Sequence, residues 1–157
     1  MRQNRRDLSQ AAAARAFALR AVARRECSAR ELQRKLMDGG APAAVAAAVV
    51  EDFTARGWQD DRRYAESLVR TRSARGYGPL RVRRDLEAAG VAAELIDAVL
   101  AVAPCQGSWR DLARHSCERH FRTPAATPAE RQKRWQFLAR RGYGSDDIRA
   151  VLGEQDP

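Results

Sequence analysis

The sequence has few of the residue types from which most catalytic sites are built. It contains only two histidines, and it has no nucleophile elbow around a serine. No glycine loop ending in Lys-Ser or Lys-Thr is present to bind phosphates. The Gly76-Tyr77-Gly78 sequence is predicted to be a turn between helices, without the preceding strand that a nucleotide-binding fold requires. The sequence therefore predicts a protein that is not an enzyme and uses no cofactor.

Cysteine is also scarce. The three cysteines, Cys27, Cys105 and Cys117, form an odd and sparse set, which argues against a disulfide framework. Together with His115 and His120 they could suggest zinc, but the Cys-x-x-Cys pair of common zinc sites is missing. We therefore expect no metal and a reducing environment.

Long apolar segments are absent. The longest apolar run, residues 41–50, is interrupted by Pro42 and is too short to span a bilayer. Four of the first seven residues are charged, no long apolar stretch follows them, and they do not resemble a signal peptide. We expect a cytoplasmic protein with no membrane partner, and the sequence does not indicate its oligomeric state.

The apolar residues that are present favour helices. Hydrophobic residues make up 45% of the 157-residue chain but aromatic residues only 6%, so that alanine, leucine and valine dominate the core. Alanine and leucine are strong helix formers, and runs such as residues 11–14 and 43–48 are rich in alanine. The composition predicts an all-α protein.

An internal repeat organises the sequence. An apolar residue four positions before a glycine is followed each time by an apolar pair that closes the next helix. The glycines are Gly40, Gly90 and Gly142, which are separated by 50 and 52 residues. We predict three tandem three-helix repeats that form an elongated, curved body. The predicted boundaries are residues 15–57, 58–103 and 104–157, after a flexible N-terminal tail over residues 1–14.

Helix signals place the elements inside the repeats. Ser28, followed by Glu31, predicts an N-cap with a capping box, and Ser145 predicts the cap of the last helix. Asp60 and Asp61 should cap a helix over about residues 62–75, and Pro79 should begin the next helix. In the third repeat, the second helix is predicted over about residues 129–141.

Charge follows the repeat. The formal net charge is +9, and nearly all of the basic residues are arginine. Residues 15–35 hold seven basic and two acidic side chains, residues 62–84 hold eight and one, and residues 119–141 hold seven and one. The third helix of each repeat is acidic instead. This segregation is typical of a surface that follows a polyanion.

We define the basic track as the twelve residues expected to contact a partner protein or DNA. They are Arg24, Arg25, Arg34, Lys35, Arg70, Arg72, Arg75, Arg81, Arg83, Arg84, Arg140 and Arg141. Tyr77, inside the stretch with the highest arginine density, is a possible aromatic contact to a base or partner. Two other interpretations remain open. The arginines could form a solvated face paired with local acids, and Tyr77 could pack on its own helices.

Several motifs together resemble the RecX family. Residues 57–91 carry its central signature, which comprises a glycine and a hydrophobic residue, an acidic pair, an Arg-aromatic-Ala sequence, and a helix of the form G-x-x-R-[IV]-x-x-x-L-x-x-x-G-[IV]. Residues 18–36 and 137–148 are similar to the first and last parts of the family pattern. Trp58 and Gln59 stand where an aliphatic pair is more usual.

This resemblance implies a regulator of RecA, the recombinase that forms filaments on single-stranded DNA. Such a protein would lie along the filament groove and inhibit ATP hydrolysis, strand exchange and co-protease activity, thereby modulating recombination, DNA repair and the SOS response. An alternative is a helix-turn-helix-like module that binds duplex DNA, and a third possibility is a scaffold for acidic proteins. Whether single-stranded or duplex DNA is contacted directly is left open by the sequence.

Overall fold

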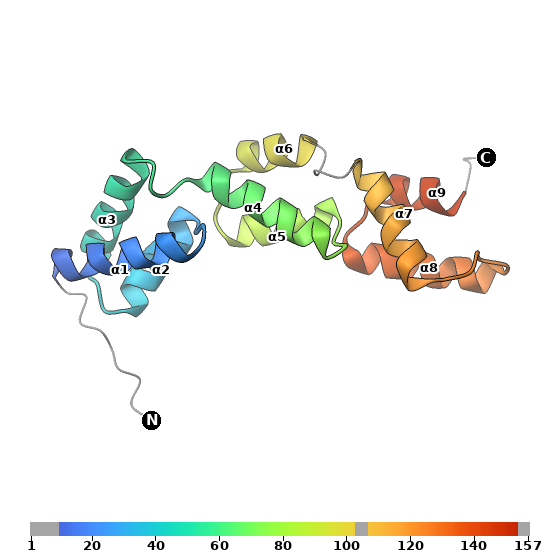
Figure 1. Cartoon of the computed structure of the whole chain (residues 1–157), viewed down its shortest axis with the longest axis horizontal. Coiled ribbons are helices and arrows are strands. Elements are labelled where there is room, and N and C mark those ends of the chain that lie inside the picture. Colours follow the sequence, from blue (N-terminus) through green and yellow to red (C-terminus); the bar gives the residue numbers. More distant parts are fainter. Residues whose placement is uncertain (1–9, 103–106, 154–157) are drawn as a thin grey trace, which may run out of the picture. The chain divides into compact units, whose positions relative to one another are not determined.

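The computed structural model describes residues 10–102 and 107–153, and these residues form nine α-helices and no strand (Figure 1). The all-α prediction and the division into three-helix repeats are confirmed. The helices of the first repeat are α1 (Ala11–Arg24), α2 (Ala29–Asp38) and α3 (Ala43–Ala55). Those of the second are α4 (Asp61–Ala74), α5 (Pro79–Ala88) and α6 (Ala93–Ala101). Those of the third are α7 (Trp109–His120), α8 (Pro128–Arg141) and α9 (Ser145–Leu152).

The chain divides into two compact units, and the division runs through the second repeat. The first unit comprises the described residues up to Ser67 together with Ala88–Ala92. The second unit comprises Leu68–Glu87 and the described residues from Ala93 onwards.

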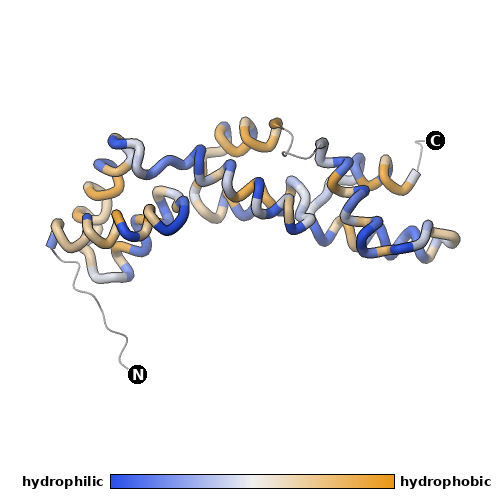
Figure 2. The backbone as a smooth tube through the Cα atoms, in the orientation of Figure 1, coloured by the Kyte–Doolittle hydropathy of each residue, from blue (hydrophilic) through white to orange (hydrophobic). Residues whose placement is uncertain are grey.

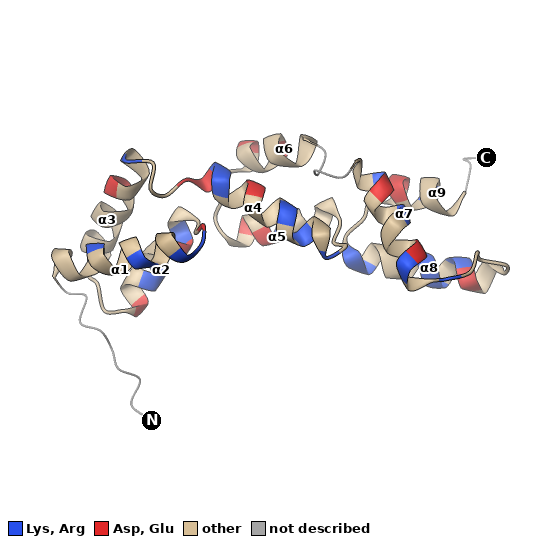
Figure 3. Ribbon diagram, in the orientation of Figure 1, with Lys and Arg blue, Asp and Glu red and all other residues tan. Residues whose placement is uncertain are grey.

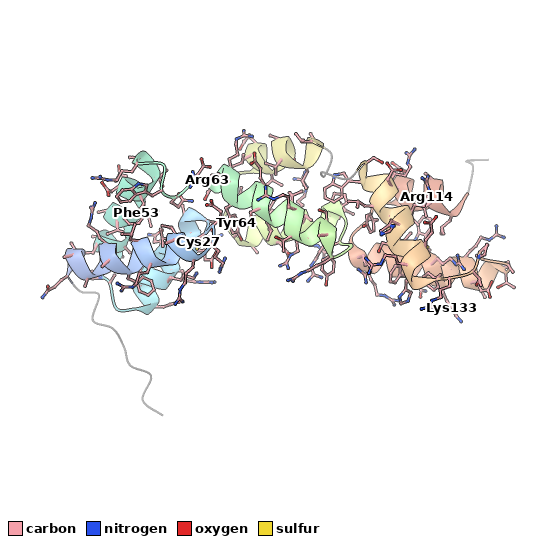
Figure 4. The ribbon with its side chains drawn as sticks, in the orientation of Figure 1. Cys27, Phe53, Arg63, Tyr64, Arg114 and Lys133 are labelled. Carbon is pink, nitrogen blue, oxygen red and sulfur yellow. The ribbon has the colours of Figure 1, made fainter. Side chains whose placement is uncertain are left out.

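The core of the first unit is built from small and branched side chains. Leu32 and Leu36, four residues apart on α2, are fully buried, as the helical period predicts. Cys27 and Phe53 also lie inside this unit (Figure 4). The alanines at the centre allow close approach of the helices; the core residues are Ala14, Ala18, Leu32, Leu36, Ala41, Ala46, Val49 and Phe53.

In the second unit too, hydrophobic and hydrophilic residues are interspersed along the helices (Figure 2), and the buried positions are mainly hydrophobic. Val82 and Leu86 of α5, four residues apart on one face of the helix, are completely buried. The core between the last three helices consists of Ala113, Cys117, Phe137, Leu138, Tyr143 and Ile148.

The helix caps agree only in part with the sequence prediction. The Ser28 hydroxyl accepts a hydrogen bond from the Glu31 amide, but the Glu31 carboxylate bonds to Arg25 and Lys35 and does not close a capping box. The prediction that Ser145 caps α9 was wrong, because the cap is Gly144 and Ser145 is already helical. Capping boxes occur instead at Ser108 and Thr127.

The helix α1 begins within the segment expected to be a tail. It starts at Ala11, and Ala14 is fully buried in the first core. Alanines have the highest helix propensity, so that the run at 11–14 extends the helix towards the N-terminus. Residues 1–9 lie outside the described part of the chain.

None of the helices in residues 10–102 and 107–153 combines the length and the apolar character that crossing a membrane would require.

Candidate partner and nucleic-acid interface

In the first unit, the start of α2 is fixed by neighbouring backbone and side chains. The Ser28 hydroxyl, which is fully buried, donates to the Ala89 carbonyl at 2.7 Å. Asp61 accepts a hydrogen bond from the Ala29 amide at 2.8 Å and from the Gln59 side chain at 2.7 Å. We call this contact between the start of α2 and the end of α5 the first junction.

The residues just before α2, Glu26 and Cys27, are held by side chains that precede or begin α4. Gln59, only 2% exposed, donates to the Cys27 carbonyl at 3.2 Å, and Arg63 pairs with Glu26 at 3.0 Å (Figure 4). Gln59 therefore has a specific structural role at a position where an aliphatic residue is more usual. Asp60 caps α4 as predicted, because its carboxylate accepts from the amides of Arg62 and Arg63.

In the second unit, the start of α5 meets the end of α8 through backbone atoms. The Gly78 amide donates to the Arg141 carbonyl at 2.8 Å, and the Leu80 amide donates to the Gly142 carbonyl at 2.9 Å. Amides at a helix start and carbonyls at a helix end are unsatisfied within their own helices, so that each end satisfies the other. We call this contact the second junction.

Half of the basic track is engaged within the protein. Asp85 lies between Arg72 and Arg81, at 2.6 and 3.5 Å, and Asp97 pairs with Arg83 at 2.5 Å. Glu31 pairs with Arg25 and Lys35. The last engaged residue is Arg141, whose guanidinium donates to the carbonyls of Arg75 and Gly76 at 2.9 and 3.4 Å.

The pairing of Glu31 also affects its ionisation. Burial disfavours the charged carboxylate, but hydrogen bonds and charge from Lys35 and Arg25 outweigh this effect and lower the pKa of Glu31. The Glu31 charge is therefore maintained at neutral pH and compensates Arg25 and Lys35 locally.

The other six residues of the basic track are free to contact a partner. Their side chains are all exposed, and within the described residues none of them makes an ion pair or a hydrogen bond. Figure 3 shows how Lys and Arg concentrate on α2, α5 and α8. We call these residues the free arginines: Arg24, Arg34, Arg70, Arg75, Arg84 and Arg140.

Tyr77 packs on its own chain. Its side chain is half-buried, and its ring lies 5.3 Å from the Arg81 guanidinium and 5.8 Å from that of Arg141. Such cation–π contacts occupy part of the ring surface that a base or partner would need. This arrangement favours the alternative that Tyr77 is a structural residue.

The possible zinc ligands do not converge. The described residues contain no group of three or more His, Cys, Asp or Glu side chains suited to a metal ion. Cys117 is buried in the core, where burial raises the pKa of its thiol, whereas His115 and His120 are exposed. Cys105 lies outside the described residues.

The chain matches three domain families in the order of its repeats. Residues 14–53 match the RecX first three-helix domain, residues 60–100 the second, and residues 110–152 the third. The chain belongs to the RecX family. A regulatory protein RecX from Xanthomonas oryzae pv. oryzae is 43% identical over 136 residues, which cover 85% of this chain and 83% of the relative. That from Acidithiobacillus ferrooxidans is 41% identical over 139 residues, covering 88% and 87%.

Solved RecX structures share the fold. The crystal structure of RecX from Lactobacillus salivarius superimposes with a TM-score of 0.80 at 18% identity, covering 92% of this chain and 95% of the other. A second crystal structure, of a regulatory protein RecX, gives a TM-score of 0.72 at 21% identity and covers 92% and 74%.

Proposed function

We propose that the protein binds RecA filaments on single-stranded DNA in the cytoplasm and inhibits RecA's ATP hydrolysis, strand exchange and co-protease activity. It would thereby modulate recombination, DNA repair and the SOS response. Membership of a family of regulatory proteins carries this proposal. Further support comes from the charge of the basic track, which suits a polyanionic partner such as a filament on DNA.

The free arginines are the proposed contacts with the filament. A guanidinium that has no carboxylate partner within its own chain can bind phosphate or a carboxylate without first breaking an ion pair. The engaged members, such as Arg72 and Arg83, would instead hold the helices in register. Of the twelve residues of the basic track, the six free arginines are therefore the contacts that we propose first, and the lack of an ion pair in the described residues supports this choice.

The alternative function, binding of duplex DNA by a helix-turn-helix-like module, has less support. In that mode the N-terminal residues of the recognition helix contact base edges in the major groove. At the second junction the amide of Gly78, just before α5, and the amide of Leu80 donate to carbonyls at the end of α8, and Gly78 is buried. The start of α5 is therefore not available to enter a groove in this conformation.

The direct test is RecA's ATP hydrolysis on single-stranded DNA, titrated with this protein far below the RecA concentration. We expect strong inhibition, which would favour action at filament ends or by propagated disassembly. If hydrolysis continues unchanged up to saturating protein, the proposal fails and duplex binding becomes the next function to test.

A further inference from the structure

A cleft in the second unit gathers hydrogen-bond donors from three helices. The end of α4, the outer face of α7 and the end of α8 line it, and no aspartate or glutamate is among the lining residues. Both histidines of the chain lie here, although they are five positions apart on α7. The polar lining residues are Ser73, Arg75, His115, Ser116, Arg119, His120 and Arg141.

Ser116 places its hydroxyl on the wall of the cleft. The residue as a whole is only 9% exposed, but its Oγ atom is not one of the described buried side-chain atoms that lack a hydrogen-bond partner. The hydroxyl is therefore reached from the cleft that Ser116 lines, and a ligand there is a suitable acceptor for its O–H.

The charged groups of the cleft are partly fixed and partly free. Arg141 is held by the carbonyls of Arg75 and Gly76, whereas the Arg75 and Arg119 guanidinium groups have no acidic partner in the described chain. Gly76 keeps the cleft open, because a Cβ atom there would lie 3.0 Å from the Ser116 hydroxyl oxygen and 2.9 Å from the Arg141 guanidinium. Guanidinium, imidazole and hydroxyl groups together suit a phosphate.

Beside these donors lies an aromatic platform. The His120 ring stacks on Phe137 with centroids 4.2 Å apart and an interplanar angle of 13°. Phe121 meets His120 edge-on at 4.7 Å, while Arg141 lies over Phe137 at 4.7 Å. His120 is exposed, so that its ring can accept a further planar group. A flat ring next to phosphate donors is typical of single-stranded nucleic-acid binding.

We propose that this cleft binds one nucleotide of single-stranded nucleic acid. Arg75, Arg119 and Ser116 contact its phosphodiester, and His120 stacks on its base. The aromatic platform favours nucleic acid over an acidic protein, which would need only the cations. The proposal concerns direct binding without RecA and therefore stands apart from the proposed inhibition of RecA.

The test measures binding of a fluorescently labelled oligothymidylate to the full chain by anisotropy, with no RecA present. Arg119→Ala and His120→Ala should each weaken binding at least about fivefold. Arg149→Ala removes one exposed arginine outside the cleft and serves as the matched control, with a change below about twofold. Circular dichroism checks that each variant is folded.

Two further comparisons identify the ligand. An oligonucleotide with abasic sites should bind the wild-type protein more weakly than oligothymidylate, and His120→Ala should remove this difference. Equal binding of both oligonucleotides by the wild type would overturn the stacking role. Equal affinity of Arg119→Ala and Arg149→Ala, or displacement of the oligonucleotide by polyglutamate at the same charge concentration, would overturn the nucleic-acid site.

Discussion

The two junctions occupy equivalent positions of the repeat but use different chemistry. Ser28 and Gly78 are separated by the 50-residue period, and Gly90 and Gly142 by the 52-residue period. In the first junction a serine hydroxyl donates to the carbonyl of Ala89. In the second, the amide of Gly78 itself donates to the carbonyl of Arg141. The repeat thus retains the meeting of helix ends while the donor changes from side chain to backbone.

The change of donor alters how closely the two helix ends of a junction approach each other. A Cβ atom on Gly78 would lie 2.4 Å from the Gly142 carbonyl oxygen, and one on Gly142 would lie 2.5 Å from the Arg81 amide nitrogen. A Cβ atom on Gly90 would have its three nearest contacts with the side chain of Arg30, at 2.5 Å from its Cδ, 3.0 Å from its Cβ and 3.3 Å from its Cγ. Backbone cannot move aside as a flexible side chain can, so the second junction should be the less tolerant one.

Gly78→Ala should have the largest effect on stability. The added methyl group would force the start of α5 away from the end of α8. We expect a loss of about 3 kcal/mol in the free energy of unfolding, measured with urea. Gly144→Ala is the matched control, because nothing lies within 4 Å of its Cβ position. Similar unfolding curves for the two variants would show that the close approach is unimportant.

Ser28→Ala tests the first junction, in which the donor is a side-chain hydroxyl. The substitution removes both the N-cap of α2 and the bond to Ala89, and leaves the carbonyl of the half-buried Ala89 without its donor. We expect a loss of about 2 kcal/mol. Ser145→Ala, at a serine that makes no cap bond, should change stability by less than about 0.5 kcal/mol in the same urea titration. Equal losses would contradict the specific role of Ser28.

Gly90→Ala sharpens the comparison of the glycines. Gly90 has a φ of +77°, which costs an alanine about 1–2 kcal/mol, but the contact with Arg30 can relax. Thermal or urea unfolding should therefore show a smaller loss than for Gly78→Ala. The double variant Gly90→Ala/Arg30→Ala should regain the part of the lost stability that is due to crowding by the Arg30 side chain beyond its Cβ. Failure to recover would assign the loss to backbone strain together with the remaining contact to the Cβ of residue 30.

Tyr143→Phe should have the smallest effect, about 1 kcal/mol at neutral pH. The Tyr143 hydroxyl donates to the Gly76 carbonyl at 3.2 Å, whereas the equivalent residue of the first junction, Val91, has no hydroxyl. The effect should also depend on pH. Burial raises the pKa of Tyr143 from 10.0 to about 12, because it disfavours the phenolate.

A raised pKa means that the folded state favours the neutral phenol. This contribution is fully present below pH 10 and is lost as the pH rises towards 12. Between about pH 10 and 12, the wild-type protein should therefore lose stability more steeply than Tyr143→Phe. Parallel pH profiles of the urea midpoint would contradict the buried position of this hydroxyl.

The helices and their buried faces were largely predictable from sequence, because glycine spacing and the 3.6-residue period are local signals. Pro79 begins α5, as predicted, and Leu36, the apolar residue four positions before Gly40, is fully buried. Caps were less predictable. Glu31 has the right spacing for a capping box, but competing partners from outside that spacing, Arg25 and Lys35, bind its carboxylate.

The contacts made by the basic track were also only partly predictable from the sequence. Its charge could be read from the sequence, but the pairing of Arg72 with Asp85 and of Arg83 with Asp97 depends on how helices pack. For the same reason the sequence did not single out Arg119 or Ser116, which join Arg75 in the cleft only after α7 packs near the end of α4. The two histidines, considered first as metal ligands, were the only signal in this region.

The most direct measurement compares two charge reversals in RecA's ATP hydrolysis on single-stranded DNA. One triple variant reverses free arginines: Arg70→Glu, Arg75→Glu and Arg84→Glu. The other makes the same change in net charge at exposed arginines outside the basic track: Arg62→Glu, Arg114→Glu and Arg149→Glu. We predict that the first variant loses inhibition and the second retains most of it, while both keep the helical spectrum. Equal inhibition by the two variants would contradict the assignment of the free arginines to the filament contact.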